Sequence, residues 1–386
     1  MRAAIYNLSS IRAPITGIGR YALELLKTQL DAGNEVFVFS NGVLHDAESA
    51  PALLIQLEAK NASIRQGQRT MLGRIPYTRD IYRALQNRQF SKVASGLLQS
   101  GALFHDLNYT PCKQASKSIS TVYDLSNIYA PETHPRHRVH YLNRYLGRLQ
   151  VNKQPIITIS QSIKNNLIEK YQICPSRIHV THLAADSKFK PRTADVCNAV
   201  LSSKALEYGR YFLSVGTLEP RKNLERVIQA FTSLDPEIQH SCPLVIVGAT
   251  GWKSSTLEKR IVKLQKLGVV RRLNYVSNTE LPILYSGALA FVYPSLYEGF
   301  GLPLLEAMQS GCACISSNSG ALSEVAGGSS LEVNPHNKEE IAQALSKLIN
   351  DNQYASILSS LGIQRASNFS WKKTAKQTQQ IYDTYS

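Results

Sequence analysis

The chain has 386 residues, 43% of them hydrophobic and 18% charged, and it carries a formal net charge of +15. This length is too great for one ordinary core and fits two domains, while no apolar run approaches the ~20 residues of a membrane-spanning helix. The first residues show no signal-peptide pattern, so we expect a cytoplasmic protein, and the positive charge favours an anionic partner.

Strand and helix patterns alternate along the first half, which predicts an α/β domain with a parallel sheet. The predicted strands lie at 3–8, 35–40, 118–123, 155–160 and 177–182. A loop with Gly17 and Gly19 is expected to open a helix at 20–32, and another helix is predicted at 162–171. The stretch 186–207 has few periodic apolar positions, and we place the domain boundary there.

The same alternation restarts after this boundary. Strands are predicted at 211–215, 244–247, 273–276, 289–293, 312–316 and 330–333, with helices at 223–233, 254–267 and 338–350. Two such arrays in succession predict two Rossmann-like domains with parallel sheets, at 1–188 and 189–370.

The strongest functional pattern runs from Tyr293 to Met308, where a buried strand leads through a glycine-containing loop into a helix. Glycines let a ligand approach the backbone, and the first turn of a helix presents N–H groups to an anion. Glu298 and Glu306 stand eight residues apart around this turn, so one can bind sugar hydroxyls and the other the ribose of a nucleotide sugar. The alternative is that Glu298 caps the helix and Glu306 lies on a solvated face.

A second strand–loop–helix pattern covers residues 215–224 and holds the adjacent cations Arg221 and Lys222. A diphosphate needs such charge for binding and for stabilisation as a leaving group, although an ordinary basic pair beside a helix is the alternative. A glycine turn at 247–252 is a weaker candidate. Asp124 follows an apolar strand, which suits a substrate-facing acid or, alternatively, a turn or N-cap residue.

Metal-binding spacing is missing from the sequence. The six cysteines are scattered without a C-x-x-C pair, and His105-Asp106 has no further ligand at sensible spacing. We therefore expect small buried cysteines and no metal site.

The combination of these patterns resembles family-four glycosyltransferases of the GT-B fold. Glu298 to Glu306 is similar to the E-x7-E motif of that family, and the segment 216–223 to its strand–loop with a diphosphate clamp. The segments 17–20, 156–162 and 369–371 are similar to its glycine loop, its strand–serine–helix and the start of its last helix. The resemblance implies two domains facing across a cleft, with residues 371–386 packing back onto the first domain.

The resemblance also implies residue roles. Asp124, Arg221, Lys222 and Glu298 are the expected catalytic residues: the two cations neutralise the leaving diphosphate, and Glu298 holds the donor sugar. The expected donor-binding residues are Gly17, Gly19, Gly216, Ser277, Gly299, Phe300, Gly301, Leu302 and Glu306, with Ser277 near the base and Glu306 on the ribose. The anomeric configuration would be retained without a metal or other cofactor, because the departing diphosphate takes the acceptor proton.

The expected activity is transfer of a hexose, mannose or a related sugar, in bacterial surface-polysaccharide assembly. Relatives often carry histidine at the position of Tyr123, which leaves the donor open between GDP-, UDP- and ADP-sugars. Basic stretches at 69–92 and 136–153 suggest an acceptor at an anionic membrane surface, such as a lipid-linked oligosaccharide, or simply two solvated helices. The alternatives are a GT-B nucleotide-sugar epimerase or hydrolase and a nucleic-acid-binding protein, although no nucleic-acid motif is present.

Overall fold

The computed structural model describes residues 3–9, 11, 17–63, 78–109, 111–134, 136–251, 255–274 and 276–385. By its contacts the chain forms two units, which we describe separately. Unit 1 comprises Met1–Tyr123, Leu142–Leu183 and Trp371–Ser386, and unit 2 comprises Asp124–Tyr141 and Ala184–Ser370. The predicted domain bounds stay a prediction; the contacts differ from them in placing Asp124–Tyr141 with unit 2.

Unit 1 holds a seven-stranded sheet in the order β3-β2-β1-β4-β5-β6-β7, parallel except for β3. The strands are β1 (Ala4–Asn7), β2 (Val36–Ser40), β3 (Val43–His45), β4 (Leu103–Asp106), β5 (Ser118–Val122), β6 (Ile156–Thr158) and β7 (Ile178–Val180). The antiparallel step from β2 to β3 is a two-residue hairpin, because Asn41 and Gly42 both have positive φ, as a type I′ turn requires.

Helices connect these strands. They are α1 (Gly17–Asp31), α2 (Ala50–Ser63), α3 (Thr78–Val93), α4 (Ser95–Gln99), α6 (Arg136–Val151), which crosses the division between the units, α7 (Gln161–Tyr171) and α17 (Trp371–Tyr385), with a short 3₁₀ turn η3 (Pro175–Arg177). The hydroxyl of Ser160 caps α7 by accepting from the N–H of Ile163 at 3.2 Å.

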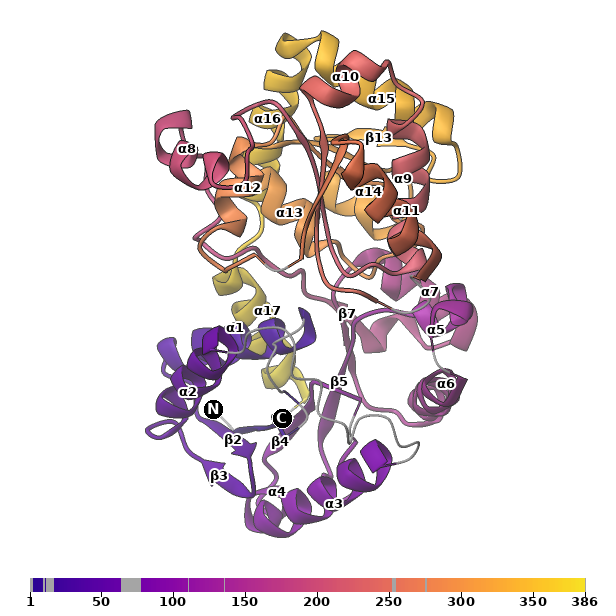
Figure 1. Ribbon diagram of the computed structural model, residues 1–386. Coiled ribbons are helices and arrows are strands. Elements are labelled where there is room, and N and C mark those ends of the chain that lie inside the picture. The colour runs from indigo at the N-terminus through magenta and orange to yellow at the C-terminus, as the bar shows by residue number, and fades with distance from the viewer. Residues whose placement is uncertain are drawn as a thin grey trace. The chain divides into compact units, whose positions relative to one another are not determined.

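The last helix of the chain, α17, belongs to unit 1 and packs against α1 (Figure 1). Its Tyr382 hydroxyl lies 2.7 Å from the hydroxyl of Tyr6 and 2.6 Å from Nδ1 of His105, all fully buried. His105 is in turn bonded through Nε2 to the hydroxyl of Thr121 at 2.7 Å. Burial lowers the pKa of His105 to about 3, so the ring is neutral in this network.

Unit 2 holds an all-parallel six-stranded sheet in the order β10-β9-β8-β11-β12-β13. The strands are β8 (Phe212–Val215), β9 (Leu244–Val247), β10 (Val270–Leu273), β11 (Ala290–Tyr293), β12 (Ala313–Ser317) and β13 (Leu331–Val333). The chain adds β9 and β10 on one side of β8 and then returns to add β11 to β13 on the other. The switch point therefore lies between β8 and β11, where α/β sheets bind ligands at the carboxyl ends of their strands.

Unit 2 also contains helices and short 3₁₀ turns. They are α5 (Ser126–Tyr129), η2 (Pro131–Thr133), α8 (Ala194–Ser202), η4 (Pro220–Lys222), α9 (Leu224–Phe231), α10 (Pro236–Ser241), α11 (Ser255–Lys266), α12 (Leu281–Gly287), α13 (Leu302–Gln309), α14 (Gly320–Ala326), α15 (Lys338–Asn350) and α16 (Asn352–Ala366).

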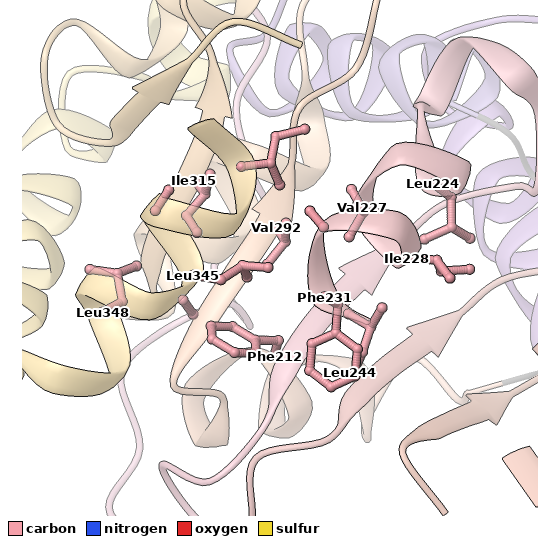
Figure 2. Packing of buried hydrophobic residues seen from close by; sticks show 14 of the residues in the cluster. Phe212, Leu224, Val227, Ile228, Phe231, Leu244, Val292, Ile315, Leu345 and Leu348 are labelled. Atoms are coloured by element: carbon pink, nitrogen blue, oxygen red, sulfur yellow. The ribbon is translucent and has the colours of Figure 1, made fainter. Parts of the chain in front are cut away.

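The core of unit 2 lies where α9 and α15 pack on the sheet (Figure 2). Leu224, Val227, Ile228 and Phe231 recur at helical spacing along α9 and are all buried against strand residues such as Phe212. Since η4 leads directly into α9, this packing fixes the turn that carries Arg221 and Lys222.

The two parallel-sheet α/β units confirm the predicted fold class. Two local expectations were wrong. The stretch 186–207, expected to be irregular, contains α8, whose Cys197 and Leu201 are buried. The strand predicted at 273–276 lies three residues earlier, because the buried Val270 pairs with Leu244. Within the described ranges, no helix has the length and apolar character to cross a membrane.

Candidate functional site

Two loops meet at the switch point of unit 2, one after β8 and one after β11. The N–H of Leu296 donates to the carbonyl of Arg221 at 2.9 Å, which ties the second loop to η4. Asn223 takes a left-handed conformation (φ 60°) and is buried, and its amide donates to the carbonyls of Pro294 and Pro335 at 2.9 and 2.6 Å. One asparagine thus joins three loops at the carboxyl edge of the sheet.

A cluster of charged side chains lies on this junction, and we call Arg221, Lys222, Tyr293 and Glu298 the switch-point cluster. Oε2 of Glu298 accepts from Nη1 of Arg221 at 2.8 Å. Oε1 of Glu298 accepts from Nζ of Lys222 at 2.6 Å and from the hydroxyl of Tyr293 at 2.8 Å. Nζ of Lys222 also lies 2.5 Å from the Tyr293 hydroxyl. One carboxylate thereby binds both predicted cations.

The cluster is held ionised by its own charges. Burial raises the pKa of a carboxyl, but the charges of Arg221 and Lys222 outweigh it and hold the pKa of Glu298 at about 2. Burial lowers the pKa of Lys222, with the charge of Glu298 opposing that fall and Arg221 adding to it. The pKa of Arg221 is raised, because the charges of Glu298 and Asp124 overcome its burial. Glu298 is therefore a carboxylate at any physiological pH.

Gly216 and Gly248 allow the loops after β8 and β9 to approach each other closely beside the switch-point cluster. A Cβ at Gly216 would stand 3.8 Å from Cε of Lys222, so the lysine stem lies along the bare backbone after β8. A Cβ at Gly248, after β9, would overlap the carbonyl oxygen of Gly216. The loops after β8 and β9 therefore approach each other more closely than any other residue type at 248 permits.

The helix α13 begins at the glycine loop, as the sequence predicts. Gly301 is its N-cap at φ 104°, and a Cβ there would overlap the buried side chain of Leu322. Leu302 is the first helical residue and lies directly after it. Phe300 is buried edge-to-face against Phe369 at 5.9 Å, so its side chain belongs to the core.

The two glutamates of this turn fit neither structural alternative. No side chain caps α13 at Gly301, and Glu298 pairs with the two cations instead. Glu306 is 5% exposed, and its Oε2 accepts from the hydroxyl of Tyr285 at 3.3 Å. The side chain of Glu306 thus points into the interior of unit 2.

Asp124 lies in unit 2 together with this cluster. Its Oδ1 accepts from the backbone N–H and the hydroxyl of Ser126 at 3.0 and 2.6 Å. The neighbouring N–H of Leu125 donates to the hydroxyl of Tyr297 at 3.0 Å, and Tyr129 stacks on Tyr297 at 5.2 Å. Tyr297 precedes Glu298 and its carbonyl accepts from Arg221, so the segment Asp124–Tyr141 is attached to the loop that carries Glu298.

Four positions named in the sequence analysis lie outside the loops that carry the switch-point cluster. The hydroxyl of Ser277 accepts from the N–H of Glu280 at 3.2 Å, and Oε2 of Glu280 accepts from the N–H of Ser277 at 3.0 Å, which is a capping box before α12. Gly17 and Gly19 form the first turn of α1 in unit 1. Tyr123 is buried in unit 1 and donates to the carbonyl of Leu107 at 2.8 Å.

The structure therefore bonds Arg221, Lys222 and Glu298 directly and places Asp124 within electrostatic range of Arg221. Sequence reasoning missed Tyr293, which bonds Lys222 and Glu298, and Ser126, which bonds Asp124. It also missed His134, whose Nε2 lies 2.8 Å from the Ser126 hydroxyl. Tyr293 ends a buried strand directly before the loop that carries Glu298. From this position its hydroxyl could have been predicted as a hydrogen-bond partner of Glu298. Ser126 and His134 carry no such signal. The functional roles of all these residues stay predictions.

Two family profiles match the chain, "Glycosyltransferase Family 4" over residues 15–189 and "Glycosyl transferases group 1" over residues 202–365. The O-antigen chain mannosyltransferase B of Escherichia coli is 32% identical over 381 residues, which cover 98% of each chain. The O-antigen chain mannosyltransferase RfbU of Salmonella typhimurium is 31% identical over 59% of this chain and 60% of its own. The structure of Anabaena Alr3699/HepE in complex with UDP and glucose matches with a TM-score of 0.72 at 16% identity, covering 99% of this chain and 100% of that one, which shows the shared fold.

Proposed function

The chain belongs to the glycosyltransferase family of these two profiles, and on that premise we propose that it transfers mannose or a related hexose from a nucleotide sugar to a saccharide with retention of the anomeric configuration. The observation that carries the proposal is the switch-point cluster, in which two half-buried cations share one carboxylate at the carboxyl edge of a parallel sheet. The mannosyltransferase names of two relatives support the sugar, and their O-antigen names support a place in surface-polysaccharide assembly.

The cluster retains donors for an anion. A guanidinium has five N–H groups and an ammonium three. Arg221 uses those on Nη1 and one on Nη2, and its buried Nε has no partner within the described residues. Lys222 uses two of its three, on Tyr293 and Glu298. The remaining donors suit the oxygens of a diphosphate, where charge develops as the sugar leaves.

Glu298 has the complementary role in this proposal. Its carboxylate accepts from the donor sugar's hydroxyls when the diphosphate draws Arg221 and Lys222 towards itself. Catalysis then rests on positioning and on charge at the leaving group, and the departing diphosphate accepts the proton of the attacking hydroxyl on the same face of the sugar. We propose that no metal or other cofactor takes part, and unchanged turnover in the presence of a chelator would support this.

A donor panel tests the activity. Purified protein is incubated with a saccharide acceptor and GDP-mannose or other GDP-, UDP- and ADP-sugars, and released nucleoside diphosphate is measured. We expect acceptor-dependent release from one donor and about 100-fold less from Lys222→Met and Glu298→Gln, which remove one charge each at similar volume. Release without acceptor would instead indicate a hydrolase, and conversion of the donor to another nucleotide sugar without release would indicate an epimerase. Wild-type rates in both variants would refute the site.

Matched controls separate chemistry from folding. Removal of one partner of a buried ion pair destabilises a protein by about 3–5 kcal/mol, so thermal unfolding must show that each variant is folded at the assay temperature. Arg260 and Glu225 form a half-exposed ion pair in the same unit. Arg260→Met and Glu225→Gln remove the same kinds of charge and are expected to keep full activity.

We also propose that the acceptor is presented at an anionic membrane surface, for example as a lipid-linked oligosaccharide. Arg136, His140, Arg144 and Arg148 recur every four residues along α6, and all four are exposed. Such spacing puts them on one side of the helix, and no acidic residue occurs between Glu132 and Glu169 to neutralise them. Of the other predicted basic stretch, 69–92, residues 69–77 lie outside the described part of the chain.

Vesicle flotation tests this surface. With anionic vesicles, we expect the double variant Arg144→Glu/Arg148→Glu to bind roughly 30-fold more weakly, since each basic residue near such a surface contributes about 1 kcal/mol. Lys259→Glu/Lys263→Glu on α11 makes the same charge change on exposed residues elsewhere and is expected to bind like the wild type. Equal flotation with neutral and anionic vesicles, or none at low salt, would remove the membrane claim.

A further inference from the structure

Asp124 is fixed through only one of its carboxylate oxygens. Both hydrogen bonds from Ser126, from its N–H and its hydroxyl, end on Oδ1. Oδ2 has no hydrogen-bond partner in the described part of the chain, and the residue is half-buried. The carboxylate is thus oriented by one oxygen while the other stays available to a ligand.

The direction of the next hydrogen bond follows from counting hydrogens. A serine hydroxyl has one hydrogen, and an ionised carboxylate accepts only. The hydroxyl of Ser126 lies 2.6 Å from Oδ1 of Asp124 and must donate there. Nε2 of His134, 2.8 Å from the same hydroxyl, must therefore be the donor of their bond. His134 is accordingly the tautomer with its hydrogen on Nε2.

The surroundings of His134 favour this neutral tautomer. Its Nδ1 is buried, and no described residue donates to it or accepts from it. A proton on Nδ1 would leave a buried N–H without an acceptor, which costs about 1–3 kcal/mol. The charged groups around the ring are Arg138 and Asp124 from its own segment and Arg221 and Glu219 from the turn before α9. Burial lowers the pKa of His134, Arg138 lowers it further and Asp124 opposes them.

We propose that His134 and Ser126 are positioning residues that hold the Asp124 carboxylate by Oδ1, so that Oδ2 accepts a hydrogen bond from a hydroxyl of the sugar substrates. The proposal rests on the glycosyltransferase function above. The chain of bonds runs His134 Nε2–H to Ser126 Oγ and Ser126 Oγ–H to Asp124 Oδ1. Because Ser126 is 3% exposed, water does not compete for its hydroxyl.

The segment Asp124–Tyr141 is attached to the loop that carries Glu298, and this attachment positions the bonds from His134 to Ser126 and Asp124 near the switch-point cluster. The bond from Leu125 to Tyr297 and the stack of Tyr129 on Tyr297 bind the backbone around Asp124 to the residue before Glu298. The charge of Asp124 is close enough to contribute to the raised pKa of Arg221. Displacement of a catalytic group by about 1 Å lowers the rate on the order of 100-fold. The orientation of the Asp124 carboxylate therefore affects the rate of transfer.

Turnover of three variants tests the proposal. With the donor and acceptor that the wild type uses, Ser126→Ala and His134→Leu are expected to lower kcat by about 10- to 100-fold. His134→Gln keeps an N–H donor near the position of Nε2 and is expected to recover most of that loss. His240→Leu removes an exposed histidine in the same unit, whose Nδ1 is bonded to Pro236, and is expected to match the wild type.

A spectroscopic measurement tests the same bonds without turnover. In protein with 15N-labelled histidine, the signals missing from His134→Gln identify His134, and they should show hydrogen on Nε2 and none on Nδ1 at neutral pH. Ser126→Ala should shift this tautomer balance. A wild-type ring with hydrogen on Nδ1, or an active wild type with equally active Ser126→Ala and His134→Leu, would overturn the proposal. A wild type that transfers no sugar from any donor would instead overturn the function, and the two failures are distinct.

Discussion

At the scale of single residues, Glu298 balances the positive charge of the site. It is the shared counterion of Arg221 and Lys222, and all three side chains are at most 16% exposed. Without this carboxylate two adjacent half-buried cations would repel each other in a region of lowered dielectric. In the free protein Glu298 therefore pairs with both cations, and in the proposed mechanism it binds the substrate once a diphosphate replaces it as their partner.

The pKa of Glu298 makes a prediction about acid stability. Because its folded pKa of about 2 lies below the ordinary value of 4.5, its contribution is complete above pH 4.5 and is lost as the pH falls towards 2. We expect a loss of about 3 kcal/mol in the free energy of unfolding across this window. In Glu298→Gln, urea titrations at several pH values should show a correspondingly smaller fall.

The comparison of the wild type with Glu298→Gln also controls for other carboxylates that titrate between pH 4.5 and 2. Glu280 also has a pKa of about 2, through its bond to Lys204 and its contacts with Ser277, and it titrates in both proteins. The difference between wild type and Glu298→Gln isolates Glu298. Parallel stability curves from pH 7 to pH 2 would contradict the assignment.

At the scale of elements, the site depends on how closely three loops approach one another at the switch point. Asn223 joins the loops after β8, β11 and β13. The contact between the loops after β8 and β9 depends on Gly248, whose α-carbon faces the carbonyl of Gly216. The position of Lys222 along Gly216 therefore depends on a glycine in the neighbouring loop, after β9.

Substitution of this glycine should damage both stability and the site. Gly248→Ala places a methyl group on a backbone carbonyl and is expected to destabilise by more than about 2 kcal/mol. Gly362→Ala is the matched control in the same unit, because its Cβ would stand at an ordinary 3.4 Å from Cβ of Met308. Thermal unfolding of both variants measures the difference, and equal midpoints would show that the two loops do not approach as described.

The sequence predicted these elements unequally well. The strand–loop–helix at 293–308 was predictable because Gly299, Gly301 and Pro303 mark the loop and the first helical turn. Helix α8 was not, since its nine residues bury only Cys197 and Leu201 and give little periodic signal. The capping box at Ser277 was readable from Glu280 three residues later, yet the family resemblance directed attention to the base of the donor instead.

At the scale of the whole molecule, the chain passes between its two units four times, after Tyr123, Tyr141, Leu183 and Ser370. Neither unit is continuous in sequence as a result. The bonds from Arg221 to Glu298 span 77 positions, and the segment with Asp124 joins unit 2 from within the sequence of unit 1. No local pattern predicts such contacts, which is why the attachment of the Asp124 segment to Tyr297 emerged only from the structure.

The packing of α17 in unit 1 should contribute measurably to the free energy of unfolding. Tyr382→Phe removes a hydroxyl that bonds Tyr6 and His105 and leaves both buried groups without that partner, at a cost of about 1–3 kcal/mol. Tyr385→Phe on the same helix removes a part-buried hydroxyl bonded to His179 at 3.1 Å and should cost clearly less. Urea unfolding compares the two; an equal or smaller loss for Tyr382→Phe would contradict the described network.

The central claim is that Arg221 and Lys222 bind the diphosphate of a nucleotide sugar, and calorimetric titration with GDP, UDP and ADP measures this directly. We expect the wild type to bind one of these nucleotides and Lys222→Met to bind it about 10- to 100-fold more weakly, since a charge-assisted hydrogen bond is lost. Arg260→Met should bind like the wild type. Equal affinity in the wild type and Lys222→Met would contradict the claim.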